Sequence, residues 1–139
     1  MALFYADASA LVKLVLDEPE SSVLRTYLDG ADVISCELVL SEIPRAIRRA
    51  AASDPALPRE RLLARTGELL DAIGLLALDR ELLIAAGTLA EPSLRALDAI
   101  HVAAAISAGA LDAFVTYDER QGAAARLAGL RTIAPAAPI

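Results

Sequence analysis

Short apolar runs alternate with amphipathic stretches along this chain. The run Leu3–Ala6 is rich in aromatic residues and predicts a strand that ends before Asp7. From Ser9 onward the apolar positions recur at helical spacing, and a second helical pattern covers Glu20–Leu28. Val33–Ser35 predicts the next strand. The beginning of the chain therefore alternates strands with helices.

The middle of the chain carries two amphipathic stretches joined by a turn at residues 53–58, which contains two prolines. An apolar stripe begins after Glu37 and runs past Pro44, where we expect a kink because proline removes a backbone hydrogen bond. The second stretch, Arg59–Ile73, predicts a helix that Gly74 closes. We expect these two helices to pack as an antiparallel pair.

The last part of the chain repeats the alternation of strands and helices. An apolar run at Leu75–Leu78 precedes Asp79, a candidate helix cap. The pattern then predicts, in chain order, a helix over Glu81–Ala90, a helix over Ala96–Ser107, a strand over Ala113–Tyr117, a helix over Glu119–Ala128 and a strand over Leu130–Ile133. Strands separated by helices predict a mostly parallel central sheet with helices on both faces. We predict one α/β domain over residues 1–139, with 134–139 as a mobile tail.

Composition supports this fold and narrows the function. The chain has 139 residues, 56% of them hydrophobic, and a mean hydropathy of +0.49, which fits one globular domain and excludes a disordered tail. With 13 basic and 19 acidic residues the formal charge is −6, which argues against a broad basic surface for nucleic acid. A nucleic-acid partner would have to be held by a metal ion and local arginines.

Cysteine and histidine usage excludes two further classes. The single cysteine, Cys36, cannot form a disulfide within the chain, and the single histidine, His101, leaves no zinc cluster of the usual kind. The N-terminal sequence lacks the basic start of a signal peptide, and no apolar run approaches the roughly 20 residues that span a bilayer. We therefore expect a cytoplasmic protein that makes no membrane contact.

Two acidic residues directly follow predicted strands. Asp7 and Asp118 each end an apolar run, and in open parallel sheets ligands bind outside the carboxyl ends of the strands. Both side chains can therefore project from the same edge of the sheet. Either residue alone could instead be a helix N-cap.

Two more acidic residues lie in apolar helical surroundings. Glu42 and Asp98 each have apolar neighbours, and a carboxylate buried without a partner costs several kcal/mol, so it pairs with a cation or a metal. The simplest partners are arginines: Arg45 or Arg49 for Glu42, and Arg95 for Asp98. Taken singly, each residue is explained by such a pair.

Taken together, the four carboxylates favour a metal site. Acids that converge at one sheet edge repel one another, and a hard divalent cation with oxygen ligands removes that repulsion. Mg²⁺, with Mn²⁺ as a substitute, can activate water and stabilise charge on a phosphoryl oxygen. A phosphodiester hydrolase is therefore the leading hypothesis.

Four sequence blocks resemble the PIN-domain ribonucleases, and within them the VapC-type toxins of bacterial toxin–antitoxin pairs. The blocks are Tyr5–Lys13, Ser41-Glu42 with Arg45-Ala46, Leu97–Ala105, and Phe114–Gln121. They occur in the family's order and at suitable separations, and the resemblance covers nearly the whole chain. It implies a PIN-like fold.

The resemblance also assigns roles to individual residues. It implies that the acidic quartet that binds the metal is Asp7, Glu42, Asp98 and Asp118. Ser9 and Thr116 match small hydroxyl positions that support water or a carboxylate, and Arg45 is the cation best placed to pair with Glu42 or to meet an RNA phosphate. Ala8 departs from the family, because many relatives carry threonine there.

The resemblance further implies the reaction and the partners. It predicts metal-dependent endonucleolytic cleavage of RNA, with transfer or ribosomal RNA as substrate, which leaves a 5′-phosphate and a 3′-hydroxyl and inhibits translation. The expected partners are a VapB-type antitoxin and further copies of the chain, in a homodimer or a toxin–antitoxin hetero-oligomer. Two alternatives stay open: a receiver-like phospho-acceptor and a catalytically silent PIN-like binding module.

Other residues carry weaker hypotheses. His101 shares a helix face with Asp98, and we expect it to be packed and hydrogen-bonded rather than to act as a general base. Lys13 either approaches phosphate or is solvated at the surface. Glu119 is interpreted as an acid favoured by the helix dipole rather than as an accessory ligand. The first two helices carry an apolar excess that would suit a partner surface, at Leu14, Leu16, Val23 and Leu24.

Overall fold

The computed structural model describes residues 1–137 and shows a five-stranded parallel sheet in the order β3-β2-β1-β4-β5. The strands are β1 (Leu3–Ala6), β2 (Asp32–Cys36), β3 (Gly74–Leu76), β4 (Ala113–Val115) and β5 (Thr132–Ile133). In the central register, Tyr5 of β1 lies between Ile34 of β2 and Phe114 of β4. The predicted α/β class and the parallel sheet are confirmed.

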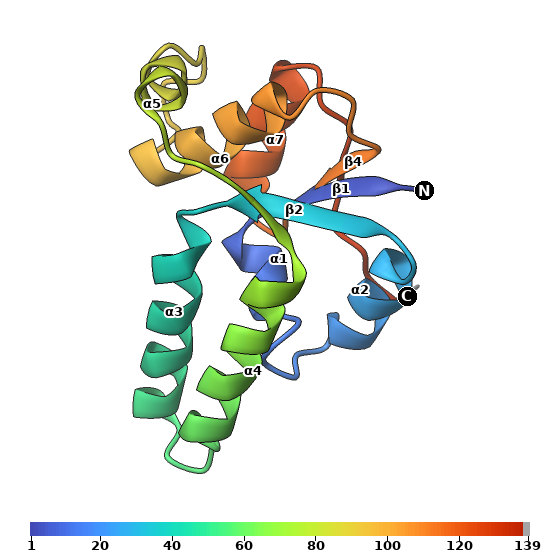
Figure 1. The fold of residues 1–139 in the computed structure, drawn as a ribbon, viewed down its shortest axis with the longest axis vertical. Helices are drawn as coiled ribbons and strands as arrows, with labels where there is room; N and C mark the ends of the chain where they lie inside the picture. Colours follow the sequence, from blue (N-terminus) through green and yellow to red (C-terminus); the bar gives the residue numbers. More distant parts are fainter. Residues whose placement is uncertain (138–139) are drawn as a thin grey trace.

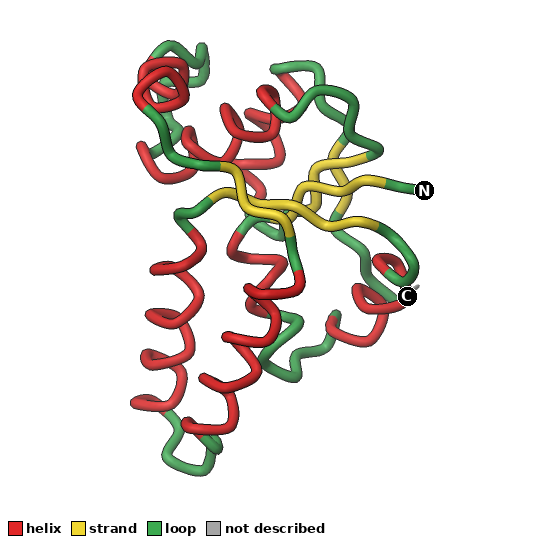
Figure 2. Tube along the Cα trace, in the orientation of Figure 1, coloured by secondary structure: helices red, strands yellow, loops and turns green. Residues whose placement is uncertain are grey.

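Helices cover both faces of this sheet, as predicted. They are α1 (Ala8–Val12), α2 (Ser21–Leu28), α3 (Val39–Ser53), α4 (Arg59–Ala72), α5 (Arg80–Gly87), α6 (Ala96–Ser107) and α7 (Glu119–Leu127). Figure 1 and Figure 2 show α1–α4 on one side of the sheet and α5–α7 on the other. The helix α1 begins two positions after the end of β1, and α7 begins four positions after the end of β4, so both N-termini lie at the carboxyl edge of the sheet.

The sheet separates two hydrophobic clusters. Successive side chains of β1 point to opposite faces, so Phe4 and Ala6 join Leu11 and Ile43 in one cluster. Tyr5 joins the other cluster, where its ring stacks on Phe114 at a centroid distance of 5.3 Å. Because both faces are covered, β1 and β4 are continuous apolar runs without polar alternation.

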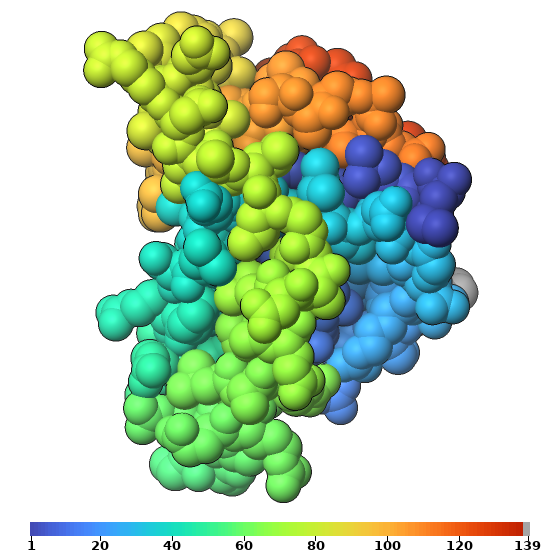
Figure 3. Space-filling model, viewed as in Figure 1, coloured from blue at the N-terminus to red at the C-terminus, as the bar shows by residue number. Residues whose placement is uncertain are grey.

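The helices α3 and α4 form the predicted antiparallel pair and stand together as a lobe in Figure 3. The helix α3 continues through Pro44 from Val39 to Ser53. Pro44 cannot donate to the carbonyl of Leu40, and Leu40 lies on an exposed part of the helix, with 48% of its surface accessible. Proline is therefore tolerated inside this helix.

Several predicted boundaries differ from the structure: α5 ends at Gly87 rather than Ala90, and β4 ends at Val115 rather than Tyr117. The helix α1 ends at Val12, and Lys13–Val15 form turns, with Val15 donating to the carbonyl of Val12 at 3.0 Å. Gly74 is not a helix cap but the first residue of β3, a strand that the pattern did not predict. A Cβ at Gly74 would lie 3.0 Å from Ile34, so this pairing of β3 with β2 needs a small residue.

The predicted apolar excess on the first two helices is wrong. Leu24 is fully buried, and Leu14 and Leu16 pack against the core. The large exposed apolar side chains lie mainly on other helices: Leu40, Leu83, Ile84, Leu97, Ile106 and Leu127. The candidate apolar contact surfaces therefore lie on α3, α5, α6 and α7 rather than on α1 and α2.

The chain ends against the body of the domain as far as the structure describes it. The Tyr117 hydroxyl donates to the carbonyl of Pro135 at 2.6 Å, and Pro135 is buried. The predicted mobile tail covers 134–139, and its residues 138 and 139 lie outside the described part. Within residues 1–137, no helix combines the length and apolar character that a bilayer crossing requires.

Candidate active site and metal centre

Asp7 lies at the carboxyl end of β1, where the chain turns directly into α1. Its Oδ1 accepts hydrogen bonds from the backbone N–H of Ala10 at 3.0 Å and from the Ser9 hydroxyl at 2.6 Å. Its Oδ2 accepts from the Thr116 hydroxyl at 2.5 Å. Asp7 is therefore the N-cap of α1, and both of its carboxylate oxygens accept hydrogen bonds. The residue is only 2% exposed.

The two hydroxyl residues on Asp7 also join the ends of neighbouring strands. The Ser9 hydroxyl oxygen accepts from the backbone N–H of Tyr117 at 3.0 Å. The Thr116 hydroxyl oxygen accepts from the backbone N–H of Asp118 at 3.0 Å. Ser9 and Thr116 thus tie the Asp7 carboxylate to the segment that carries Asp118.

Glu42, in the first turns of α3, contacts the buried histidine of α6. His101 Nε2 lies 2.6 Å from Glu42 Oε1, and His101 Nδ1 lies 2.8 Å from the Tyr5 hydroxyl. His101 is 1% exposed, which confirms that it is packed and hydrogen-bonded. Cys36 Sγ lies 3.7 Å from Nδ1, and Cys36 is buried as a free thiol.

Asp98 and Asp118 are bridged by a glutamine of α7. Gln121 Nε2 donates to Asp98 Oδ1 at 2.9 Å, while the backbone N–H of Gln121 donates to Asp118 Oδ1 at 3.0 Å. Asp118 is therefore the N-cap of α7, as Asp7 is of α1. The Gln121 side-chain carbonyl is buried and has no hydrogen-bond partner in residues 1–137.

Burial and like charge raise the pKa of two carboxyl groups in this set. Burial raises the pKa of Asp7, and the hydrogen bonds from Ser9 and Thr116 oppose that rise. Burial first, and then the neighbouring charges of Asp118 and Glu42, raise the pKa of Asp98. The carboxylates of three elements are thus close enough to repel one another.

The pKa of His101 is raised, which favours the protonated imidazole and so strengthens its contact with the Glu42 carboxylate. Burial lowers this pKa, but hydrogen bonds to Cys36 and Glu42 outweigh burial and raise it to about 10. An N–H on Nε2 therefore faces the Glu42 carboxylate. The arginine pairs that the sequence offers as alternatives are not formed: within residues 1–137 no ion pair joins Arg45 or Arg49 to Glu42. Asp98 likewise makes no ion pair in that range.

The donor set fits a hard divalent cation by its chemistry. Four carboxylates at one edge of the sheet offer only oxygen ligands, which Mg²⁺ and Mn²⁺ prefer, and a cation there relieves the repulsion at Asp98. In the described residues, however, no three acidic, histidine or cysteine side chains lie together at metal-binding distance. Each carboxylate is instead held by its own hydrogen bonds.

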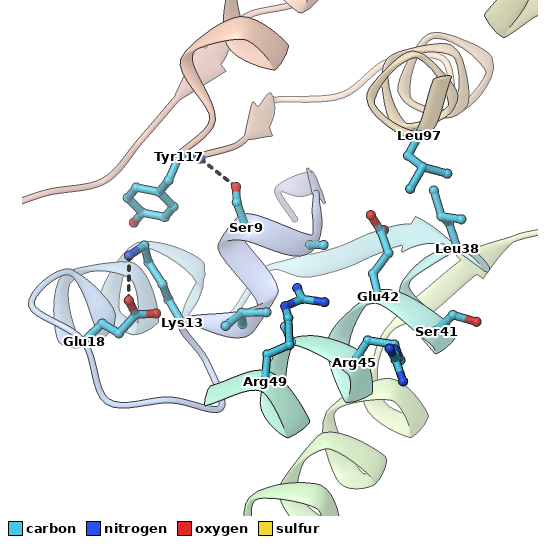
Figure 4. Close-up of a pocket in the computed structure, with 13 residues that line it drawn as sticks. Ser9, Lys13, Glu18, Leu38, Ser41, Glu42, Arg45, Arg49, Leu97 and Tyr117 are labelled. Atoms are coloured by element: carbon cyan, nitrogen blue, oxygen red, sulfur yellow. Dashed lines mark hydrogen bonds and ion pairs between the residues drawn. The ribbon is translucent and has the colours of Figure 1, made fainter. Parts of the chain in front are cut away.

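A cavity of about 610 Å³ opens beside Glu42 (Figure 4). Its wall includes Ser9, Glu42 and two arginines of α3, Arg45 and Arg49. Leu97, at the start of α6, closes one side. The predicted support residues Ser9 and Arg45 therefore lie in one cavity with a member of the quartet.

Lys13 lines the same cavity but is neither solvated nor available. Its Nζ lies 2.9 Å from Glu20 and 3.5 Å from Glu18, and it sits 4.9 Å from the centroid of the Tyr117 ring. The Lys13 side chain is 13% exposed. The structure thus replaces both predicted roles of Lys13 with an ion-paired position against an aromatic ring.

A second cavity, of about 470 Å³, adjoins two further members of the quartet, Asp98 and Asp118, while Asp7 lines neither cavity. It is lined by Arg95, Asp98, Asp118, Glu119 and Arg120. Leu97 lines the first cavity and its neighbour Asp98 lines the second, so the N-terminal end of α6 stands between them.

Sequence reasoning missed two contributors to the site. Gln121 holds Asp98, and its position three residues after Asp118 is the signal that could have indicated it, since residues at that spacing share a helix face. Tyr5 supports His101 from β1. No local signal indicates Tyr5, because its partner is 96 positions away.

Together, the fold and the site define a class: parallel α/β proteins with an acidic cluster at the carboxyl edge of the sheet. The PIN domain family profile matches residues 4–127. Ribonuclease VapC46 of Mycobacterium tuberculosis (strain ATCC 25618 / H37Rv) is 40% identical over 137 residues, which are 97% of this chain and 99% of the relative. Ribonuclease VapC47 of Mycobacterium tuberculosis (strain CDC 1551 / Oshkosh) is 38% identical over 141 aligned positions, covering 97% and 98%. The chain belongs to the PIN domain family, among the relatives of the VapC ribonucleases.

Solved structures show the same fold at lower sequence identity. The crystal structure of VapC20 of Mycobacterium tuberculosis, described as a toxin that cleaves the sarcin-ricin loop, aligns with a TM-score of 0.73 and 15% identity over 95% of this chain and 99% of that one. VapBC2 from Rickettsia felis, bound to a DNA fragment of its promoter, aligns with a TM-score of 0.69 and 13% identity over 94% and 97%. These likenesses establish the fold.

Proposed function

We propose that this protein is a metal-dependent endoribonuclease that acts as the toxin of a toxin–antitoxin pair. The observation that carries the proposal is the carboxylate set that β1, α3, α6 and the end of β4 bring to one edge of the sheet, at Asp7, Glu42, Asp98 and Asp118. Two relatives that align over 97% of this chain are named ribonucleases, which supports the same activity.

The quartet would hold Mg²⁺, or Mn²⁺ in its place. Bound there, the cation supplies activation of water and stabilisation of charge on the phosphoryl oxygens. The residues of the chain orient the ligands: Ser9 and Thr116 hold Asp7, His101 holds Glu42, and Gln121 holds Asp98. Cleavage of a phosphodiester bond then leaves a 5′-phosphate and a 3′-hydroxyl.

Transfer or ribosomal RNA is the proposed substrate, and inhibition of translation is the proposed outcome. A VapB-type antitoxin is the proposed partner, because VapBC2 of Rickettsia felis shares the fold. An antitoxin residue of positive charge would complement the acidic edge and mask it. Homodimers or toxin–antitoxin hetero-oligomers are the expected assemblies, in the cytoplasm.

The experiment that tests this function is sequencing of RNA ends after brief expression of the chain. We expect new 5′-phosphate ends at one or a few sites and arrested growth. Asp7→Asn should abolish both without loss of the fold, while Asp71→Asn, an exposed acid of α4, should change neither. Undiminished cleavage by pure Asp7→Asn protein would overturn the assignment of the quartet.

One observation favours a second candidate, a silent binding module. In residues 1–137 no three potential ligands lie together at metal-binding distance. Titration with Mn²⁺ followed by thermal shift separates the two functions, because a silent module gains no stability from the metal and cleaves no RNA.

A further inference from the structure

Two arginines of α3 line the first cavity, the one of about 610 Å³ that opens beside Glu42. Arg45 and Arg49 both line it and follow Glu42 along the same helix. At a rise of about 1.5 Å per residue, four positions separate the two along the helix axis by about 6 Å. Figure 4 shows Arg49 reaching from α3 into the cavity. In the first cavity, the carboxylate of Glu42 is therefore followed by two guanidinium groups, those of Arg45 and Arg49.

A second pair of arginines lines the adjoining cavity. Arg95 and Arg120 lie there with the carboxylates of Asp98 and Asp118. Because Leu97 belongs to the first cavity and Asp98 to the second, the two cavities lie on either side of the start of α6. Glu42 thus shares a cavity with one pair of arginines, and Asp98 and Asp118 share a cavity with the other pair.

All four of these guanidinium groups are available for a ligand. Within residues 1–137, none of them takes part in an ion pair or a side-chain hydrogen bond: Arg45, Arg49, Arg95 and Arg120. Lys13, by contrast, is already neutralised by Glu18 and Glu20. What distinguishes these four arginines from others that are unpaired in the described part of the chain, such as Arg48 and Arg61, is that they share a cavity with carboxylates of the quartet.

The planar guanidinium group binds phosphate oxygens through two parallel N–H donors, which makes arginine well suited to phosphate contacts. A strand of RNA whose scissile phosphate lies at the quartet must place its neighbouring phosphates on either side of it. An acidic peptide could also meet the arginines, but only RNA brings a scissile phosphate to the quartet, where the proposed metal ion would offset the charge of the carboxylates. The paired arrangement around the quartet therefore favours RNA.

We propose that the two arginine pairs bind the RNA strand on opposite sides of the scissile phosphate, with Arg45 and Arg49 on one side and Arg95 and Arg120 on the other. This inference rests on the proposed function and adds the path of the substrate. It explains how an acidic protein holds a polyanion: a short strand is bound at four points instead of on a broad basic face.

The test uses two double variants and a control of equal charge. Arg45→Gln/Arg49→Gln removes one pair, and Arg95→Gln/Arg120→Gln removes the other. The control removes Arg48, exposed on α3, and Arg61, exposed on α4, both outside the two cavities. All are made in the Asp7→Asn background, so that a fluorescent single-stranded RNA spanning the mapped cleavage site stays intact during binding with Mg²⁺.

Each cavity variant should weaken RNA binding about tenfold, because hydrogen bonds to charged groups are the strong ones. The slope of log Kd against log salt should fall by about 0.7 for each phosphate of the single strand that the variant no longer neutralises. The control should leave affinity and slope as in the parent protein. RNAs shortened on the 5′ or the 3′ side of the cleaved bond assign the sides: each pair should lose its effect with one truncation only.

Three results would overturn the proposed path. In the first, the cavity variants bind RNA as tightly as the control does. In the second, both pairs lose their effect with the same truncation. In the third, the cavity variants lose affinity for the antitoxin but not for RNA, which would make the cavities a peptide-binding surface. Each of these results leaves the ribonuclease function standing if the wild-type chain cleaves RNA. Failure of the wild-type chain to cleave any RNA with Mg²⁺ or Mn²⁺ would overturn the function itself.

Discussion

His101 Nε2 lies 2.6 Å from Glu42 Oε1, and this contact joins the middle of α6 to the start of α3 at the wall of the main cavity. The imidazole is itself held from behind by the Tyr5 hydroxyl of the central strand. The orientation of one carboxylate of the site therefore depends on two residues in the interior of the domain. His101 is a positioning residue for Glu42.

Replacing His101 should separate stability from metal affinity. His101→Leu leaves Glu42 without its donor and Tyr5 without a side-chain partner, and should cost about 2–4 kcal/mol of unfolding free energy. His101→Gln keeps an N–H donor and should recover part of the Mn²⁺ affinity that His101→Leu loses. Calorimetric titration with Mn²⁺ and urea unfolding measure the two effects. Equal Mn²⁺ affinity in both variants and the wild type would contradict the positioning role.

Gln121→Met tests the bridge between Asp98 and α7. The substitution removes the donor to Asp98 and also the buried carbonyl that lacks a partner, so the change in unfolding free energy should stay within about 1 kcal/mol. The hydrogen bond from Gln121 lowers the pKa of Asp98, so its removal should raise that pKa further and weaken Mn²⁺ binding at pH 7. A carboxyl pKa from NMR titration of the metal-free protein checks the direction. Unchanged Mn²⁺ affinity would show that Gln121 serves packing alone.

Asp7→Asn should stabilise the metal-free protein at pH 7. Burial raises the pKa of Asp7 in the folded state, so the folded chain binds more protons than the unfolded chain between the two pKa values. The wild type therefore loses stability as pH rises through the folded pKa of Asp7, and the variant does not. In EDTA at pH 7 the variant should melt at a higher temperature than the wild type, and its advantage should shrink toward pH 4. A variant that melts lower at pH 7 would contradict this sign.

Metal addition should stabilise the wild type through the quartet. Mn²⁺ at 100 times its Kd should add about 2.7 kcal/mol to the unfolding free energy, because it binds the folded state alone. Asp98→Asn should remove most of this gain, whereas Glu119→Gln, an exposed acid beside the quartet, should keep it if Glu119 serves only the helix dipole. Thermal melts with and without Mn²⁺ measure both. Absence of the gain in Glu119→Gln would make that residue a ligand.

Most of the fold could be predicted from local pattern. Buried parallel strands such as Leu3–Ala6 are continuous apolar runs, and Asp79 and Asp118 mark helix starts because their side chains cap the next backbone N–H groups. The strand β3 was missed because its three residues are an edge strand whose only partner, β2, lies far away in sequence. The early end of α1 at Val12 was missed because the apolar positions continue at helical spacing through the turns that follow.

The sequence suggests which carboxylates to consider for the candidate site, and their role as metal ligands stays a prediction, but it does not indicate their contacts. The four acids follow from their positions at strand ends and in apolar helices. Sequence spacing favoured nearby arginines as partners for Glu42, and the structure instead supplies His101, which is 59 positions away. Partners separated by such distances are set by packing of the helices against the sheet, which no local pattern encodes.

The hydrogen bond between Thr116 and Asp7 spans 109 positions of a 139-residue chain. During synthesis Asp7 is made early, but its partner Thr116, which directly follows β4, is made only when most of the chain is complete. The sheet order places β1 between β2 and β4, so this edge cannot close before the last strands arrive. A nascent or truncated chain that ends before β4 therefore lacks both Thr116 and Asp118, and the carboxylate set is complete only when nearly the whole polypeptide has been made.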